Sequence, residues 1–288
     1  MGTLSKQLTA VAVGLTAAMM LSACAAGPAT TPAPEQTTAG GSSPAAEITV
    51  VKVGASPVPH ARILEFIDQN LAAAAGIDLE ITEFDDYVLP NEALASGQID
   101  ANYFQHLPYL QDQIAEKGYQ FEHGAGVHIE PYAAFSSKHK SFAEVPDGAT
   151  IAITSDVANQ IRGLRLLEEI GQLHGITDDS TVISLTAEQN PRGFKFVENQ
   201  PEVIVKQLDD PAIDVAFVNG NFILSAGLNA ADAIAIEKVE GNPNANLLVW
   251  RTDNTNPGVP ILEELLTGPE TADFIRQTWP SGDVLPQG

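Results

Sequence analysis

The feature that most constrains the fold is a strand, a helix and a second strand in succession within residues 48–84. Residues 48–54 are rich in β-branched side chains and end at a glycine, a pattern typical of a strand. Apolar residues then recur at helical spacing between Ser56 and Gly76, which predicts a helix that the glycine ends. Residues 77–84 alternate as a second strand. This β-α-β order favours parallel strands with helices on both faces of the sheet.

The same rhythm restarts near residue 149 and predicts a second sheet. Strands are expected at 150–153, 182–185 and 213–218, with helices at 159–170 and near 201–208. Short β-like stretches at 132–136 and 245–250 would carry the chain between the two sheets. We therefore predict two α/β lobes joined by two crossover segments, with lobe 1 formed by 48–133 and 246–288 and lobe 2 by 134–245. Ligands of such folds bind at the carboxyl ends of the strands, in the crevice between the lobes.

Residues 1–23 have the composition of an export signal peptide. Lys6 is followed by an uncharged apolar stretch from Leu8 to Ala23, shorter than the ~20 residues that span a bilayer. The sequence LSAC, which ends at Cys24, resembles the bacterial lipobox, whose cysteine receives a diacylglyceryl thioether before cleavage. We expect lipidation at Cys24, an extracytoplasmic protein anchored in the cell membrane, and a linker over 24–47, which is rich in Pro, Gly, Ser and Thr.

Charge and cysteine content exclude several classes of function. Lys and Arg total 14 against 37 Asp and Glu, a formal net charge of -23, so no nucleic-acid partner is expected. Cys24 is the only cysteine, which rules out internal disulfides and cysteine-based zinc or redox motifs. The chain has no G-x-S-x-G or H-E-x-x-H motif, and adjacent carboxylates such as Glu168 and Glu169 point apart on a helix. We predict neither an enzyme nor a cofactor.

The histidines make a metal-binding lipoprotein the alternative from a different ligand class. His123, His128 and His139 fall within 17 residues, but none shows the tight spacing of a zinc site. We predict surface or loop positions for these three and for His174, and no metal site.

Two sequence blocks in the first lobe resemble those of a known family. Residues 84–94 (FDDYVLPNEAL) are similar to the signature F-x-D-Y-x-x-P-N-x-A-L, and residues 99–110 (IDANYFQHLPYL) are similar to I-D-A-N-x-F-Q-H-x-P-Y-L. Both signatures belong to the methionine-binding lipoproteins of the NlpA family, and the resemblance runs over nearly all of residues 48–280. It implies a type II periplasmic-binding-protein fold that closes on its ligand. It also implies a substrate-binding protein that delivers L- or D-methionine to the permease and ATPase of an ABC importer.

The resemblance also places seven residues at the ligand. They are Tyr87, Phe104 and Tyr109 as an aromatic cage for the thioether side chain, His106 beside the cage, Arg162 at the carboxylate, and Asn219 and Asn246 at the polar end. The chain departs from the family pattern at Ser155, where Asn is usual, and at Ile161, where Gly usually precedes the arginine.

These residue types fit that chemistry, although each has a plainer interpretation. Arg162 would lie in the first turn of the 159–170 helix, where free N–H groups and the helix dipole favour a carboxylate that a guanidinium can bind bidentately. The alternative is a solvated arginine on the helix surface, which is what we predict for Arg165. The three rings would equally suit a core, and the two asparagines would equally suit structural amides. Because an aromatic cage accepts other apolar side chains, the alternative ligands are a methionine-containing dipeptide and another apolar amino acid.

Overall fold

The computed structural model describes residues 48–287, which belong to one compact unit. The predicted signal peptide over 1–23, the lipidation at Cys24 and the linker over 24–47 lie outside these residues. Within the described part of the chain, no helix combines the length and the apolar character needed to cross a membrane.

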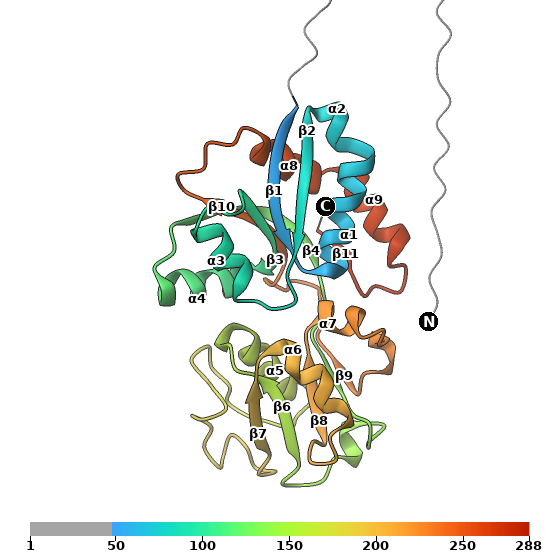
Figure 1. The fold of residues 1–288 in the computed structure, drawn as a ribbon. Helices are drawn as coiled ribbons and strands as arrows, with labels where there is room; N and C mark the ends of the chain where they lie inside the picture. Colours follow the sequence, from blue (N-terminus) through green and yellow to red (C-terminus); the bar gives the residue numbers. More distant parts are fainter. Residues whose placement is uncertain (1–47, 288) are drawn as a thin grey trace, which may run out of the picture. The chain divides into compact units, whose positions relative to one another are not determined.

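The first sheet has six strands in the order β11-β4-β10-β3-β1-β2 (Figure 1). They are β1 (Thr49–Ala55), β2 (Ile77–Glu83), β3 (Ala101–His106), β4 (Phe121–Ile129), β10 (Asn246–Arg251) and β11 (Leu285–Pro286). β1 is parallel to both β2 and β3, as the β-α-β pattern predicts. β10 is antiparallel to β3 and β4, and β11 is antiparallel to β4, so the sheet is mixed rather than wholly parallel. The two reversed strands are those that the chain adds after it returns from the second sheet.

The chain between β1 and β2 is largely helical, as the spacing of its apolar residues predicts. Its segments are η1 (Pro57–Ala61), α1 (Arg62–Ile67), η2 (Asp68–Ala72) and α2 (Ala73–Ala75). Gly76 then ends the run in the left-handed conformation, with φ at 80°, which glycine adopts without a steric penalty.

Helices cover both faces of the first sheet. The others of this lobe are α3 (Leu89–Ala95), α4 (Leu107–Lys117), α8 (Gly258–Leu266) and α9 (Pro269–Thr278). Phe66 of α1 stacks on Phe274 of α9 with 4.2 Å between ring centroids, and Figure 1 shows these two helices side by side. Alternate residues of β10 point to opposite faces: Leu248 joins the core under α1 and α8, whereas Leu247 and Val249 join the core under α3 and α4.

The second sheet has five strands in the order β7-β6-β8-β5-β9. They are β5 (Ala133–Phe135), β6 (Thr150–Thr154), β7 (Lys195–Asn199), β8 (Val215–Val218) and β9 (Ala235–Ile236). β6 is parallel to β7 and β8, and β5 is antiparallel to β8 and β9. The helices of this lobe are η3 (Phe142–Glu144), α5 (Val157–Glu169), α6 (Pro201–Ile204), η4 (Val205–Asp209), α7 (Gly220–Ser225) and η5 (Ala230–Asp232).

The strand predicted at 182–185 is wrong, because that segment forms turns. The N–H of Thr181 donates to Oγ of Ser184, and the N–H of Ser184 donates to the carbonyl of Thr181, both over 2.9 Å. Such local bonds give the backbone an alternative to a sheet ladder. Ile183, which suggested a buried strand, is 85% exposed. The strand beside β6 is instead β7, which the sequence pattern missed.

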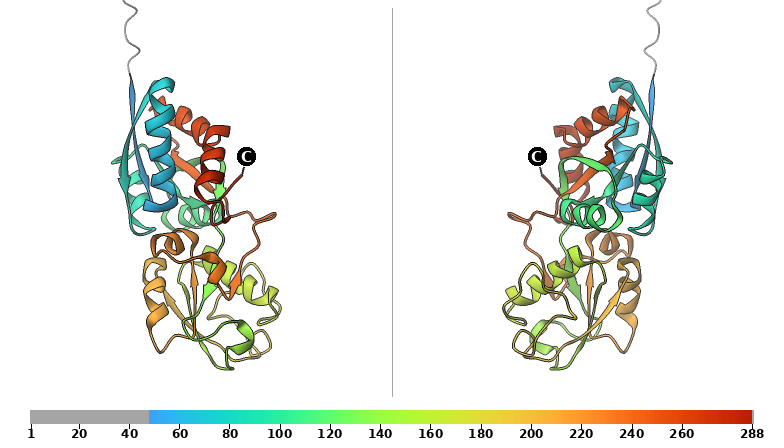
Figure 2. Two further views of the ribbon diagram at one scale, coloured as in Figure 1. Left: turned by 90° about the vertical axis from the view of Figure 1, so that its right-hand side faces the viewer. Right: turned by 90° about the vertical axis from the view of Figure 1, so that its left-hand side faces the viewer.

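The chain crosses between the two sheets twice, from β4 to β5 and from β9 to β10, and the crossings can be followed in Figures 1 and 2. Strands of the first sheet lie within 49–129 and 246–286, and strands of the second lie within 133–236. The predicted architecture of two α/β lobes is therefore confirmed. The predicted lobe boundaries stay predictions. Strand β5 of the second sheet begins at Ala133, one residue before the predicted start of lobe 2 at residue 134.

Candidate ligand-binding site

A cavity between the two lobes is lined by residues from both sheets. It has about 340 Å³ of space free of protein atoms, including its open mouth. All seven residues that the resemblance predicts for the ligand line it, namely Tyr87, Phe104, His106, Tyr109, Arg162, Asn219 and Asn246, and all seven are buried. It is also lined by five residues that we had not predicted, Gln105, Glu130, Asn159, Gly220 and Asn221. Phe104 and His106 lie at the end of β3 and Asn219 follows β8, so the site lies at the carboxyl ends of strands, as expected.

One wall of the cavity is aromatic. The ring centroids of Tyr87 lie 5.8 Å from those of Phe104 and of Tyr109, and 5.4 Å from that of Phe222 in α7. The hydroxyl of Tyr87 donates to Oδ1 of Asn221 over 2.5 Å, which ties the first lobe to the second. The hydroxyl of Tyr109 donates to the carbonyl of Tyr87 over 3.0 Å. The three predicted rings thus belong to an apolar cluster and also face the cavity, so the two interpretations of these residues are compatible.

Arg162 is buried in the opposite wall rather than solvated on the helix surface. Its Nε and Nη2 donate to the two carboxylate oxygens of Glu237, over 3.2 and 2.6 Å. Its Nη1 donates to Oδ1 of Asn159 over 2.9 Å, and Nη2 also donates to the carbonyl of Glu130 over 3.2 Å. Burial opposes its charge, but Glu237 outweighs burial and raises the pKa of Arg162. Arg165 is exposed and pairs with Asp178, as predicted for a surface residue.

Two parts of the argument for Arg162 need correction. Helix α5 begins at Val157, two residues earlier than predicted, so Arg162 lies in its second turn and not its first. The first turn is capped by Asp156, whose carboxylate accepts the N–H of Asn159 over 2.8 Å and so occupies the position expected for a ligand anion. The bidentate partner of Arg162 in the structure is Glu237, which we had not predicted. Ile161 is half-buried against the core of the second lobe and does not displace Arg162 from the cavity.

Asn159 connects the polar groups of the two lobes. Its Oδ1 accepts from Arg162, from Nδ2 of Asn219 over 3.0 Å and from Nε2 of His106 over 3.0 Å. His106 Nδ1 accepts the N–H of Tyr109, so the ring proton lies on Nε2, and burial lowers the pKa of His106 to about 3. Among the described residues, no donor reaches the buried Oδ1 of Asn219. A hydrogen-bond acceptor that lines a cavity without a partner suits a ligand that carries a donor.

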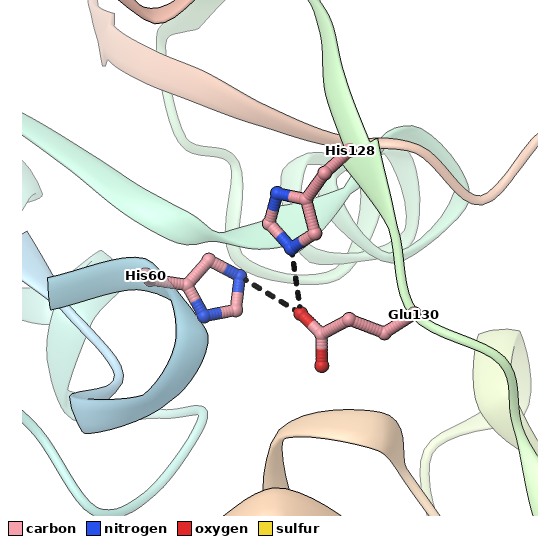
Figure 3. Close-up of side chains that lie close together, drawn as sticks. All are labelled: His60, His128 and Glu130. Atoms are coloured by element: carbon pink, nitrogen blue, oxygen red, sulfur yellow. Dashed lines mark hydrogen bonds and ion pairs between the residues drawn. The ribbon is translucent and has the colours of Figure 1, made fainter. Parts of the chain in front are cut away.

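Glu130 provides the negative charge of the cavity wall, and it lies between two histidines (Figure 3). Oε1 of Glu130 lies 2.8 Å from Nε2 of His128 and 3.3 Å from Nε2 of His60. His128 is fully buried in β4, so its predicted surface or loop position is wrong; it pairs with Asn246 of β10, and its ring packs against His60 and Tyr103. Within residues 48–287, these three side chains form the group whose ligand atoms lie close enough, within 4.8 Å of one another, to hold a metal ion.

Burial sets the protonation of this group. It lowers the pKa of His60 to about 4 and that of His128 to about 3, so both imidazoles are neutral at pH 7. Burial also raises the pKa of Glu130, although His60, Arg162 and the backbone N–H of Asn221 oppose that shift.

Two lobes that are linked by two crossovers and enclose a buried cavity with aromatic and charged walls define a bilobal solute-binding protein. The chain belongs to the NlpA lipoprotein family, whose model matches residues 51–288. This is a family of binding lipoproteins and not of enzymes.

Relatives and solved structures agree with this assignment. The methionine-binding lipoprotein MetQ of Bacillus subtilis is 36% identical over 244 residues, which cover 82% of this chain and 87% of that protein. The D-methionine-binding lipoprotein MetQ of Escherichia coli is 36% identical over 208 residues, covering 71% and 76%. A nutrient-binding protein of Burkholderia cenocepacia, solved bound to methionine, is 32% identical, with a TM-score of 0.76 over 83% of this chain and 100% of that one. These matches confirm the predicted family and its fold.

Proposed function

We propose that the protein is a substrate-binding lipoprotein that captures methionine outside the cytoplasm and delivers it to the permease and ATPase of an ABC importer. The observation that carries the proposal is a single buried cavity with an aromatic wall, a carboxylate and a guanidinium. An α-amino acid with an apolar side chain needs one group of each kind. The relatives named for methionine or D-methionine support this choice of ligand.

In this proposal, the thioether lies among Tyr87, Phe104 and Tyr109. A sulfur atom against an aromatic ring contributes about 0.3–1.5 kcal/mol per contact, so three rings favour methionine over an aliphatic side chain of similar size. The planes of these rings meet at 53 to 78°, so both ring faces and ring edges are available to the ligand side chain.

The charged ends of the ligand would bind on the polar wall. The ammonium would donate to Glu130 and to Oδ1 of Asn219, the acceptor that has no partner among the described residues. The carboxylate would bind to Arg162, four of whose five N–H groups already hold protein oxygens, so it meets a cation fixed in place. A guanidinium held in this way loses little side-chain entropy on binding. Asn246 and His106, which also line the cavity, would complete the shell around the ligand.

The same proposal includes the membrane anchor. Relatives of the family are named lipoproteins, and the residues at 21–24 resemble a lipobox. We place a lipid on Cys24 and the binding lobes on the extracytoplasmic side of the cell membrane.

Titration calorimetry with different amino acids tests the proposed selectivity. L-Methionine should bind with one molecule per chain, whereas glutamate and lysine should bind at least about a hundredfold more weakly. The reason is that their side-chain charges would be desolvated among rings that offer them no partner. Equal affinity for glutamate would rule out the aromatic wall as the binding place of the side chain.

A further inference from the structure

The carboxylate of Glu130 is held by an unusual set of donors. Nε2 of His128 at 2.8 Å and Nδ2 of Asn246 at 3.4 Å donate to its Oε1, and Nε2 of His60 lies 3.3 Å from the same oxygen. His60 comes from η1, His128 from β4 and Asn246 from β10, so three elements of the first lobe meet at one oxygen. Figure 3 shows the second oxygen of Glu130 pointing away from both rings.

The hydrogen bonds around each ring fix which nitrogen carries the proton. Nδ1 of His128 pairs with the hydroxyl of Tyr103, which is the donor because Nε2 of the same neutral ring donates to Glu130. Nε2 of His60 faces two acceptors, Oε1 of Glu130 and Oδ1 of Asn246, whereas its Nδ1 has no partner among the described residues. Both rings are therefore neutral Nε2–H tautomers. The N–H of His128 donates to Glu130, whereas the N–H of His60 is hydrogen-bonded to Asn246 and lies beside the same carboxylate oxygen.

We infer that His60 and His128, the latter held by Tyr103, are positioning residues that keep Glu130 ionised and aimed at the cationic amino group of the ligand. This inference rests on the proposed function, because it assigns the ammonium to Glu130. Donors that converge on one oxygen favour the charged form of a buried carboxylate, and the backbone N–H of Asn221 adds to them. The other oxygen lies beside Gly220, which also lines the cavity, and there we place the ligand ammonium. The arrangement selects ligands with a free, protonated α-amino group.

A metal ion on the same three side chains is the competing interpretation. The 2.8 Å separation of His128 Nε2 and Glu130 Oε1 is that of a hydrogen bond, and it is shorter than the ~3.3 Å expected between two ligands of a tetrahedral zinc ion with bonds near 2.0 Å. A divalent cation there would also occupy the carboxylate that the ammonium needs. The hydrogen-bonded arrangement is the one that agrees with the observed distances.

The pH dependence of binding reports on this network. Besides the two histidines, the titratable groups that face Glu130 are Arg162 from α5, Tyr103 and Tyr87. Arg162 lowers the pKa of Glu130, and Glu130 adds to burial in raising the pKa of both tyrosines. Arg162 and the two tyrosines keep their charge states between about pH 5.5 and pH 8. The ligand ammonium binds the ionised carboxylate, so affinity is constant above the pKa of Glu130 and falls as the pH drops through it. When donors are removed, that pKa rises further, and the fall moves to higher pH.

The test is the affinity for L-methionine as a function of pH in the full chain, measured by calorimetry. His60→Leu removes the N–H that lies beside Oε1 of Glu130 and is bonded to Asn246. The double variant Tyr103→Phe/His128→Leu removes the donor of the 2.8 Å bond and leaves no stranded tyrosine hydroxyl. Each should weaken binding at pH 6 by about tenfold or more, with partial recovery at about pH 8. His60→Leu in a Glu130→Gln background should change affinity by less than about threefold, because its partner charge is already gone.

The outcomes separate the two claims. If the wild-type protein does not bind L-methionine, the proposed function fails. If it does bind, the inference is overturned by a loss that is the same at every pH, or by the same loss in the Glu130→Gln background. Stoichiometric binding of zinc alone to the wild type, abolished in His60→Leu, would overturn it in favour of a metal site. Thermal melting shows whether each variant is folded. If either His60→Leu or the double variant does not fold, the pH dependence of the other variant tests the inference.

Discussion

Replacing Arg162 with alanine should weaken the binding of L-methionine by ~30- to several-thousand-fold, which corresponds to about 2–5 kcal/mol. The loss should appear mainly as faster release. The variant strands the carboxylate of the bound ligand and also the half-buried Glu237, which loses both of its bonds from the guanidinium. Its melting temperature should therefore fall as well, because an unpaired buried charge destabilises the fold. Calorimetry on protein shown to be folded measures the affinity.

Arg165→Ala is the matched control for this experiment. Arg165 lies one turn further along α5, is 56% exposed and pairs with an exposed aspartate, so the variant should change the affinity by less than about threefold. Arg162→Lys should also bind poorly, because an ammonium cannot bond Glu237 at two points and keep the remaining bonds of the guanidinium. If Arg165→Ala lost affinity and Arg162→Ala did not, the carboxylate would bind elsewhere in the cleft.

Replacing Glu130 with glutamine should also lower the affinity for L-methionine by about 30-fold or more, because the ammonium loses its counter-charge in a buried site. The stability of the ligand-free protein, in contrast, should stay the same or increase. Burial raises the pKa of Glu130, so the folded state binds its proton more readily than the unfolded state, and the ionised carboxylate destabilises the fold at neutral pH. The ligand-free variant should melt at the wild-type temperature or above it.

Glu122→Gln provides the control for the charge change, since Glu122 is exposed and lies in β4, the strand that ends one residue before Glu130. It should leave both affinity and melting temperature near the wild-type values. A Glu130→Gln protein that melts lower and binds normally would contradict the assignment of the ammonium.

The contrast between predicted and missed residues has a physical reason. Four of the seven predicted residues lie in the two continuous blocks 84–94 and 99–110. All seven line one cavity because β3, α5, β8 and β10 each have an end beside it. Glu130 and Glu237 lie in the two crossovers, where no periodicity marks a residue, and their roles depend on partners far along the chain. Asn159 lies in the first turn of α5, three residues before Arg162, and this helical spacing is the signal that marks it.

Local interactions explain why some predicted elements differ from the structure. Residues 182–185 look like a strand by composition, but hydroxyl groups bond their backbone into turns. The predicted start of α5 is two residues late because the apolar spacing begins after the first turn, whereas Asp156 is the N-cap and sets the start at Val157. His128 follows Gly124 and Gly126, which suggest a loop, whereas the segment pairs with β10 as a strand and the ring is buried.

The central claim is that one cavity holds both charged ends of one methionine molecule, and titration of the wild-type protein with end-modified ligands tests it most directly. L-Methionine should bind with one molecule per chain. N-Acetyl-L-methionine, which lacks the ammonium, and L-methioninamide, which lacks the carboxylate, should each bind at least about a hundredfold more weakly, because each leaves Glu130 or Arg162 without its ligand partner. Binding of either analogue as tight as that of L-methionine would contradict the account.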